Sequence, residues 1–115
     1  MESLLATKSI EFSVGLVGLY KWLAFEKKEF VMSKQLLRCG TSVGANIHEA
    51  KYAISRADFI AKMHIALKEC SETEYWFEIL KRTGYMGNEF KELLELHEEL
   101  KRMLVSTLKT CKKNI

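Results

Sequence analysis

Proline is absent from this 115-residue sequence, and glycine occurs only six times. Folds that alternate strands with tight turns are usually punctuated by both residues, so an all-helical chain is the most economical interpretation. Long uncharged apolar runs are also missing, and the first residues, M-E-S-L-L-A-T-K-S-I-E, lack the basic start and the apolar core of a signal peptide. We therefore expect no membrane association and a cytoplasmic location.

Cysteine is scarce and widely spaced. The three cysteines, Cys39, Cys70 and Cys111, form no C-x-x-C pair, and their odd number rules out a complete disulfide framework. Each falls at an apolar position of a helical pattern, so we expect buried, reduced thiols that pack like small hydrophobic side chains.

Composition favours one ordinary folded domain spanning residues 1–115. Apolar residues make up 48% of the chain and charged residues 29%, which is far from the signature of disorder. The formal net charge of +3 permits an anionic partner without requiring one.

Apolar residues recur at helical spacing in four segments. The first is predicted from about Ser3 to Phe25, and the second starts near Ser33 as its N-cap. The third starts at the S-R-A-D capping box of residues 55–58 and runs to Thr83, and Asn88 caps the fourth. Four such helices joined by short connections predict an antiparallel up-down-up-down four-helix bundle.

Catalytic and metal-binding patterns are incomplete. H-E-A-K-Y and H-E-E-L-K begin at His48 and His97, but neither has the second histidine, four residues later, of a zinc-binding H-E-x-x-H helix. The Glu-x-x-His motif of di-iron bundles, a P-loop and a G-x-S-x-G nucleophile are also absent. We predict no enzyme activity, catalytic residue, metal or cofactor, and leave open whether His48, His64 and His97 approach one another.

The segment T-S-V-G-A-N-I-H-E-A is unusually polar for the middle of a helix. Ser42, Asn46 and Glu49 form one row beside an apolar row of Val43, Ile47, Ala50 and Ile54. We expect the polar row to border the core and to bond across to Lys62, Glu69, Thr73 or Glu74. The alternatives are partner binding and catalysis. Gly40 and Gly44 lie on a neighbouring line, where missing side chains allow another helix to approach closely.

The residues Q-L-L-R-C-G-T-S-V-G-A-N-I-H-E-A, with S-R-A-D-F-I-A-K-M-H-I-A-L-K-E-C-S-E-T-E-Y-W-F-E-I-L, resemble the 23S rRNA intervening-sequence protein family. The family motif falls on Ser42, Ala45, Asn46, Ile47 and Glu49, with Trp76 at its large apolar position. The resemblance implies a four-helix bundle that assembles as a homopentamer. Some family members are encoded within insertions in large-subunit ribosomal RNA genes. The accessory protein of diversity-generating retroelements, which binds nucleic acid, has a similar fold.

Two functions remain as hypotheses. The first is a non-catalytic oligomer that binds RNA or DNA through a basic surface. Its candidate contacts are Lys34, Arg38, Lys51 and Arg56. The second is a scaffold or adaptor that binds a protein partner and has no nucleic-acid role. The candidate helix or subunit interface consists of Gly40, Gly44, Ile47, Tyr75 and Trp76; whether Trp76 is an interface anchor or a core residue is open.

Overall fold

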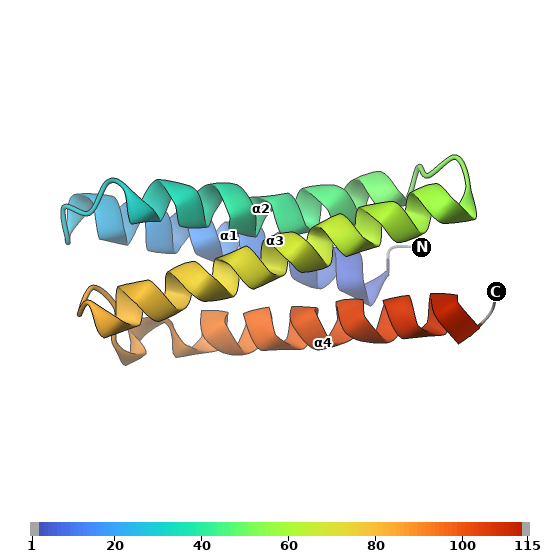
Figure 1. Ribbon diagram of the computed structural model, residues 1–115. Coiled ribbons are helices and arrows are strands. Elements are labelled where there is room, and N and C mark those ends of the chain that lie inside the picture. Colours follow the sequence, from blue (N-terminus) through green and yellow to red (C-terminus); the bar gives the residue numbers. More distant parts are fainter. Residues whose placement is uncertain (1–2, 114–115) are drawn as a thin grey trace.

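The computed structural model describes residues 3–113, with side chains up to residue 112. Four long helices run alternately in opposite directions along one axis (Figure 1). They are α1 (Leu4–Phe25), α2 (Met32–Ala50), α3 (Arg56–Arg82) and α4 (Lys91–Lys113), with a short 3₁₀ helix, η1 (Asn88–Phe90), before α4. The predicted antiparallel up-down-up-down bundle is confirmed. Within the described residues, no helix is long and apolar enough to cross a membrane.

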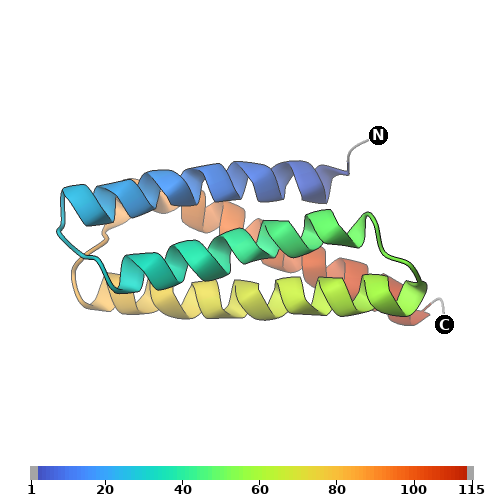
Figure 2. The ribbon, with the colours of Figure 1, turned by 90° about the horizontal axis from the view of Figure 1, so that it is seen from above.

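The bundle is a rod of 47 × 22 × 21 Å whose core runs along its length. Viewed from above, α1 and α3 lie on opposite edges and α2 lies between them (Figure 2). The core is filled mainly by leucines at helical spacing, such as Leu16 and Leu19 of α1 and Leu100 and Leu104 of α4, each no more than 1% exposed. This continuous core explains how a chain of modest size folds without disulfide bonds.

Two helices start at a serine N-cap. Ser3, near which the first helix was predicted to begin, caps α1, because its Oγ accepts a hydrogen bond from the backbone N–H of Ala6. Ser55 caps α3 in the same way by accepting from Asp58, and the Asp58 carboxylate accepts from the N–H of Ile54. The predicted start of α3 at Ser55 is confirmed, but the reciprocal bond of a capping box is shifted by one residue, because Asp58 accepts from Ile54 and not from Ser55. The predicted apolar row on α2 is wrong at Ile54, because α2 ends at Ala50 and the Ile54 side chain is 93% exposed in the following loop.

Ser33 is not the N-cap of α2, which corrects the prediction. The carboxylate of Glu29 caps this helix instead, by accepting from the backbone N–H groups of Val31, Met32 and Ser33 at 3.0, 3.1 and 2.7 Å. Ser33 lies inside the first turn, fully buried, and donates its hydroxyl to the carbonyl of Glu29. Burial opposes ionisation of Glu29, but the hydrogen bonds outweigh it and lower the pKa of this carboxyl.

Asn88 does not cap the fourth helix either. It is the first residue of η1, which has no side-chain cap, and the α-helix proper starts at Lys91. The carboxylate of Glu89 accepts from the N–H of Gly87 and so takes up one free donor of the turn. The predicted turn between α3 and the fourth helix is confirmed, and Gly84 within it has a positive φ of 83°.

Candidate functional site

The polar row of α2 borders the core but mostly bonds within its own helix. Ser42 and Asn46 are half-buried; Ser42 donates to the carbonyl of Arg38 and Asn46 donates to the carbonyl of Ser42, both at 2.8 Å. Only Glu49 reaches α3, where it pairs with Lys62 at 3.3 Å. The prediction of bonds from this row to α3 is therefore wrong for Ser42 and Asn46 and confirmed for Glu49. A hydrogen bond from a side chain to a carbonyl of its own helix satisfies the polar group and destabilises the helix only slightly.

Gly40 and Gly44 allow close packing between two helices of the same subunit. A Cβ atom at Gly40 would overlap the side chain of Leu16, and one at Gly44 would lie 3.3 Å from the backbone oxygen of Ser9. Both glycines thus let α1 lie close to α2, which accounts for their cost in helix propensity of about 1 kcal/mol each. Ile47 is 2% exposed and belongs to the same core.

A polar cluster links α2 to α3 around Arg38. Its guanidinium pairs with Glu72 and lies 3.7 Å from Glu69, and Gln35 accepts from it on the same helix. The same oxygen of Glu72, Oε2, also accepts from Nε1 of Trp76 at 3.1 Å, and this indole is half-buried against the core. The other aromatic candidate, Tyr75, contacts the Trp76 ring edge-on and is 57% exposed. The sequence pattern did not reveal this cluster.

His97 forms a second cluster, in the core. Its ring is 2% exposed and lies between Phe12 and Phe77, with ring centroids 5.7 and 5.4 Å away. Nε2 lies 3.0 Å from the carbonyl oxygen of Cys70 and 3.3 Å from the Cys70 thiol. A carbonyl can only accept, so Nε2 carries the proton and donates it.

This cysteine–histidine contact does not activate a nucleophile. Burial raises the pKa of Cys70 to about 12, so the sulfur stays protonated near neutral pH. The nitrogen that faces it is already a donor and cannot act as a base towards it. Cys39, also buried, has a raised pKa for the same reason, and accepts from the hydroxyl of Thr73. All three cysteines are free; Cys111, predicted to be buried, is only half-buried.

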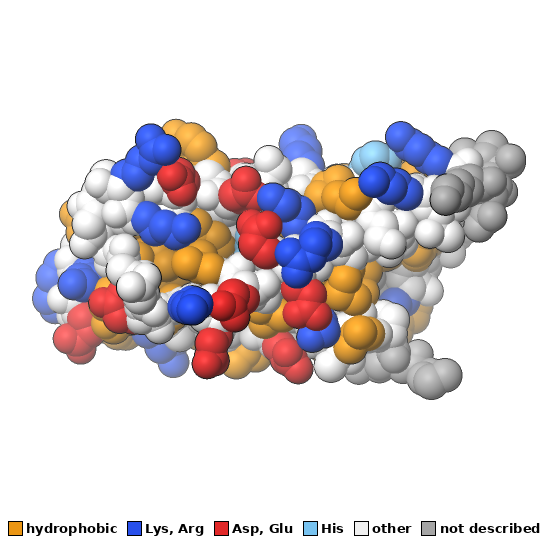
Figure 3. Space-filling view, turned by 90° about the horizontal axis from the view of Figure 1, so that it is seen from below, with side chains coloured by type: hydrophobic (Ala, Val, Ile, Leu, Met, Phe, Trp, Pro, Cys, Tyr) orange, Lys and Arg blue, Asp and Glu red, His pale blue; other side chains and the backbone are white. Residues whose placement is uncertain are grey.

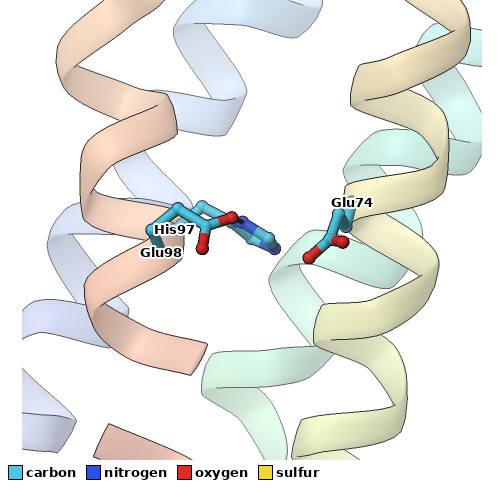
Figure 4. Close-up of side chains that lie close together, drawn as sticks. All are labelled: Glu74, His97 and Glu98. Atoms are coloured by element: carbon cyan, nitrogen blue, oxygen red, sulfur yellow. Dashed lines mark ion pairs between the residues drawn. The ribbon is translucent and has the colours of Figure 1, made fainter. Parts of the chain in front are cut away.

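Glu74, His97 and Glu98 are the one group of three metal-type ligands within residues 3–113, with ligand atoms no more than 4.8 Å apart. Figure 4 shows Glu74 on α3 pointing towards His97 and Glu98 on α4. His48 and His64 are not part of it, so the three histidines do not form a common ligand set in this part of the chain. His48 contacts Tyr52 instead.

The ammonium of Lys101 already pairs with both carboxylates of this group. It lies 2.5 Å from Glu74 and 3.6 Å from Glu98. The hydrogen bond from Lys101 lowers the pKa of Glu74 and raises that of Lys101, as expected for a pair stabilised in its charged form. A metal ion would have to displace this lysine, so the cluster is better described as an ion pair that ties α3 to α4.

The four candidate nucleic-acid contacts do not form one patch. Lys34 and Arg38 lie in the first turns of α2, whereas Lys51 follows its last residue and Arg56 is the first residue of α3. At 1.5 Å per residue the two pairs are roughly 20–30 Å apart along the rod. Arg38 is held by its carboxylate partners, and Arg56 donates to the carbonyl of Cys111 at 2.6 Å, which brings it to the end of α4.

The second half of α4, from its middle at Lys101, adds cations that were not among the candidate contacts. A shallow hollow of about 460 Å³ lies on the outer side of this helix, and its lining contains three cations and two hydroxyls but no acidic residue. The lining residues are Lys101, Arg102, Val105, Ser106, Lys109 and Thr110. Figure 3 views this side, and basic side chains without acidic ones occupy the part nearest the grey termini.

Comparison with known proteins adds the family. Residues 2–106 match the family described as 23S rRNA-intervening sequence protein. The chain belongs to this family. The chain is also similar to a crystal structure from Bacteroides thetaiotaomicron, described as a protein with unknown function from the S23 ribosomal protein family. The two share 54% identity and a TM-score of 0.89, over 92% of this chain and 96% of that one. No curated protein matches significantly.

Family membership accounts for the bundle. The motif positions Ser42, Asn46 and Ile47 lie where α2 adjoins the core, and Glu49 pairs with α3. Of these residues, Ile47 packs in the core and Glu49 ties α2 to α3, whereas Ser42 and Asn46 bond within α2. The description of the relative assigns no activity to that protein.

Proposed function

We propose that this chain is a non-catalytic, self-assembling helical bundle that binds nucleic acid through the basic end formed by the last turns of α4, the end of α2 and the start of α3. The support comes from the hollow on α4, whose lining combines cations and hydroxyls without a carboxylate. Phosphate groups are recognised by this combination, and the attraction does not depend on base sequence.

The balance of charge at this end supports the proposal. Lys51, Arg56, Lys109 and Lys112 lie at the end of the rod where α2 and α4 finish and α3 begins. The nearby acids already have partners: Glu49 pairs with Lys62, and Asp58 caps the start of α3. Among the described residues, little negative charge at this end is therefore left to offset the cations.

The absence of a catalytic arrangement is part of the proposal. Within the described residues, the cysteine–histidine contact is inert and both carboxylates of the Glu74–His97–Glu98 group pair with Lys101. A reaction would need a nucleophile or base with matched partners, and these clusters supply neither. We also propose that the protein assembles as a homopentamer, as the family resemblance implies, and works in the cytoplasm, where its free thiols stay reduced.

Fluorescence anisotropy with labelled 20-nucleotide RNA and DNA tests the function. We expect binding at 50 mM salt that weakens steeply by 200 mM, because each neutralised phosphate releases counterions. No binding at 50 mM salt would eliminate the proposal and leave the adaptor alternative in its place.

A matched pair of variants locates the contact. Arg102→Glu with Lys109→Glu should weaken binding at least tenfold. Lys34→Glu with Lys91→Glu makes the same change in charge at the other end of the rod, and should weaken it much less. Equal losses in both variants would show that overall charge, and not this end of the molecule, governs binding.

A further inference from the structure

Large apolar side chains are exposed on two of the four helices. Among the described residues, α1 exposes five, α3 exposes two, and α2 and α4 expose none. On α1 they are Leu4, Ile10, Val14, Val17 and Phe25; on α3 they are Ile65 and Tyr75. Val14 is 68% exposed and stands in a stretch from Phe12 to Tyr20 that contains no charge. A solvated helix face is normally charged, so this one is typical of a surface that is covered by another molecule.

Gly18 stands on the same outward side of α1, and no contact with the described residues explains it. A Cβ atom added there would have no neighbour within 4 Å, whereas one at Gly15 would lie 2.6 Å from Leu93 of α4. Glycine inside a helix costs about 1 kcal/mol relative to alanine, and a packing contact is the usual compensation. For Gly18 such a contact has to come from outside the subunit.

The outward sides of α1 and α3 are suited to contact each other between copies. The two helices lie on opposite edges of the bundle and start at the same end of the rod (Figures 1 and 2). Contacts with α2 show which residues of α1 and α3 lie at the same level along the rod axis. Gly40 of α2 lies against Leu16 of α1, and the adjacent Cys39 accepts a hydrogen bond from Thr73 of α3. Leu16 and Thr73, which are 57 positions apart, therefore lie at about the same height.

Charged residues of opposite sign are paired when each residue of α1 is set opposite the residue of α3 that follows it by 57 positions. We define the α1 face as Glu11, Val14, Gly18, Lys21 and Phe25, and the α3 face as Lys68, Ser71, Tyr75, Glu78 and Arg82. Each member of the second set follows its counterpart in the first by 57 positions, and all ten residues are exposed.

Four of the five pairs are complementary. Glu11 would face Lys68 and Lys21 would face Glu78, so both charge pairs are of opposite sign; Glu78 also pairs with Arg82 on its own helix at 2.9 Å. Gly18 would leave room for the Tyr75 ring, and Phe25 would face Arg82 in the manner of a cation–π contact. The fifth pair joins Val14 to Ser71, neither of which is charged. Glu11, Lys21 and Lys68 form no ion pair within the described part of the chain, so they are available.

We propose that a second copy of this chain packs its α3 face against the α1 face of the first copy. The two helices are parallel and lie at the same level along the rod axis. The proposal rests on the self-assembly part of the proposed function and names the surface that performs it. The two faces are different and lie on opposite edges, so each copy has one of each to offer. Such head-to-tail contacts close into a ring when the rotation permits, with the axis along the rods. All basic ends then point the same way.

Engineered cysteines test which faces meet. Val14→Cys and Ser71→Cys in one chain, in a Cys111→Ser background, should give a ladder of disulfide-linked species on mild oxidation, because the two positions face each other across the contact. Each single variant should give none. Val14→Cys with Ser106→Cys on the outer side of α4 is the matched control and should also give none.

Every outcome of this experiment is informative. A ladder in the Val14/Ser71 variant alone supports the contact. Dimers from the Val14→Cys variant alone would show that two α1 faces meet each other, and the proposal would fail. A wild-type chain that stays monomeric in sedimentation at all concentrations would remove self-assembly as well, whereas an assembled wild type without any cross-link would remove only this contact.

Charge reversal provides a second test in solution. Glu11→Lys and Lys68→Glu should each raise the dissociation constant of the assembly at least fivefold, and the double variant should return to within about twofold of the wild type. Losses that add instead of cancelling would show that the two residues do not meet.

Gly18→Gln separates assembly from folding. The subunit has room for the new side chain, so helicity should be unchanged, but the Tyr75 ring loses its place and assembly should weaken at least tenfold. Ser106→Gln, also on an exposed helix surface, is the control and should assemble normally. An unchanged assembly in the Gly18 variant would contradict the proposal, whatever its stability.

Discussion

Helices α1 and α4 each pack one side into the core but present opposite surfaces on the other side. The outward side of α4 is charged throughout, with acids such as Glu92 and Glu95 in its first half and bases such as Arg102 and Lys109 in its second. This order complements the helix dipole. The outward side of α1 is apolar around Val14. The charged outward side of α4 is what solvent exposure in an isolated subunit requires. The exposed apolar side chains of α1 are explained only by a contact with another molecule.

The largest expected difference lies between the two sides of α1. Leu19→Ala removes a side chain that is 0% exposed and should lower the free energy of unfolding by about 2–5 kcal/mol through loss of burial and cavity formation. Val14→Ala should change it by less than about 0.5 kcal/mol in the dissociated subunit. Urea unfolding at low protein concentration measures both. Similar losses for both would mean that Val14 is buried within the subunit.

The two glycines of α1 sharpen the same comparison. Gly15→Gln places a side chain against Leu93 and should destabilise the subunit by about 1–3 kcal/mol. Gly18→Gln points into open space and should stabilise it by up to about 1 kcal/mol through better helix propensity. Thermal unfolding of both variants against the wild type tests this, and a destabilised Gly18 variant would contradict the assigned orientation.

The helix starts offer an intermediate effect that depends on pH. Glu29→Gln weakens the three backbone contacts of a carboxylate that is 7% exposed, and should cost about 1–2 kcal/mol at pH 7. The folded-state pKa of Glu29 is lowered, so its contribution is complete above the unfolded pKa of about 4.5 and is lost as pH falls through the folded pKa.

Glu89→Gln at the start of η1 is the matched control for Glu29. Its carboxylate is exposed and contacts the N–H of Gly87, so the loss should be much smaller. Chemical unfolding between pH 3 and pH 7 distinguishes the two variants. A constant difference between Glu29→Gln and the wild type over this range would show that ionisation of Glu29 is not responsible.

The smallest effect is expected at the polar surface of α4. Lys101→Gln breaks the pairs with Glu74 and Glu98 and should cost about 0.2–1 kcal/mol, because partly exposed ion pairs are screened by water and salt. Unfolding at 50 mM and 500 mM salt should show a cost that shrinks at the higher concentration. A loss above about 3 kcal/mol would indicate that Lys101 also compensates a buried charge in the His97 cluster.

The fold could be predicted from local patterns, and the clusters could not. Ser55 caps its helix as expected, because a serine cap is satisfied within four residues. Ser33 and Asn88 were assigned by the same rule and are not caps, because Glu29 and η1 provide a competing solution that depends on how the loops turn. Ile54 was lost from its predicted row because α2 ends earlier than its apolar spacing suggests.

The candidate site shows the same limit. The border position of Ser42 and Asn46 followed from helix spacing, but their partners did not, because own-helix carbonyls compete with facing side chains. The contacts of His97 with Cys70 and of Lys101 with Glu74 join residues 27 positions apart, and no local pattern signals them.

By itself the sequence determined four helices and the side of each that enters the core, because both depend on spacing within one helix. Only the tertiary structure decided which helix faces which, the relative levels of α1 and α3 along the rod axis, the exposure of the apolar side chains around Val14, and the pairing of Lys101 with two carboxylates. Those features depend on loop geometry and on packing between distant segments, where side chains compete for the same partners.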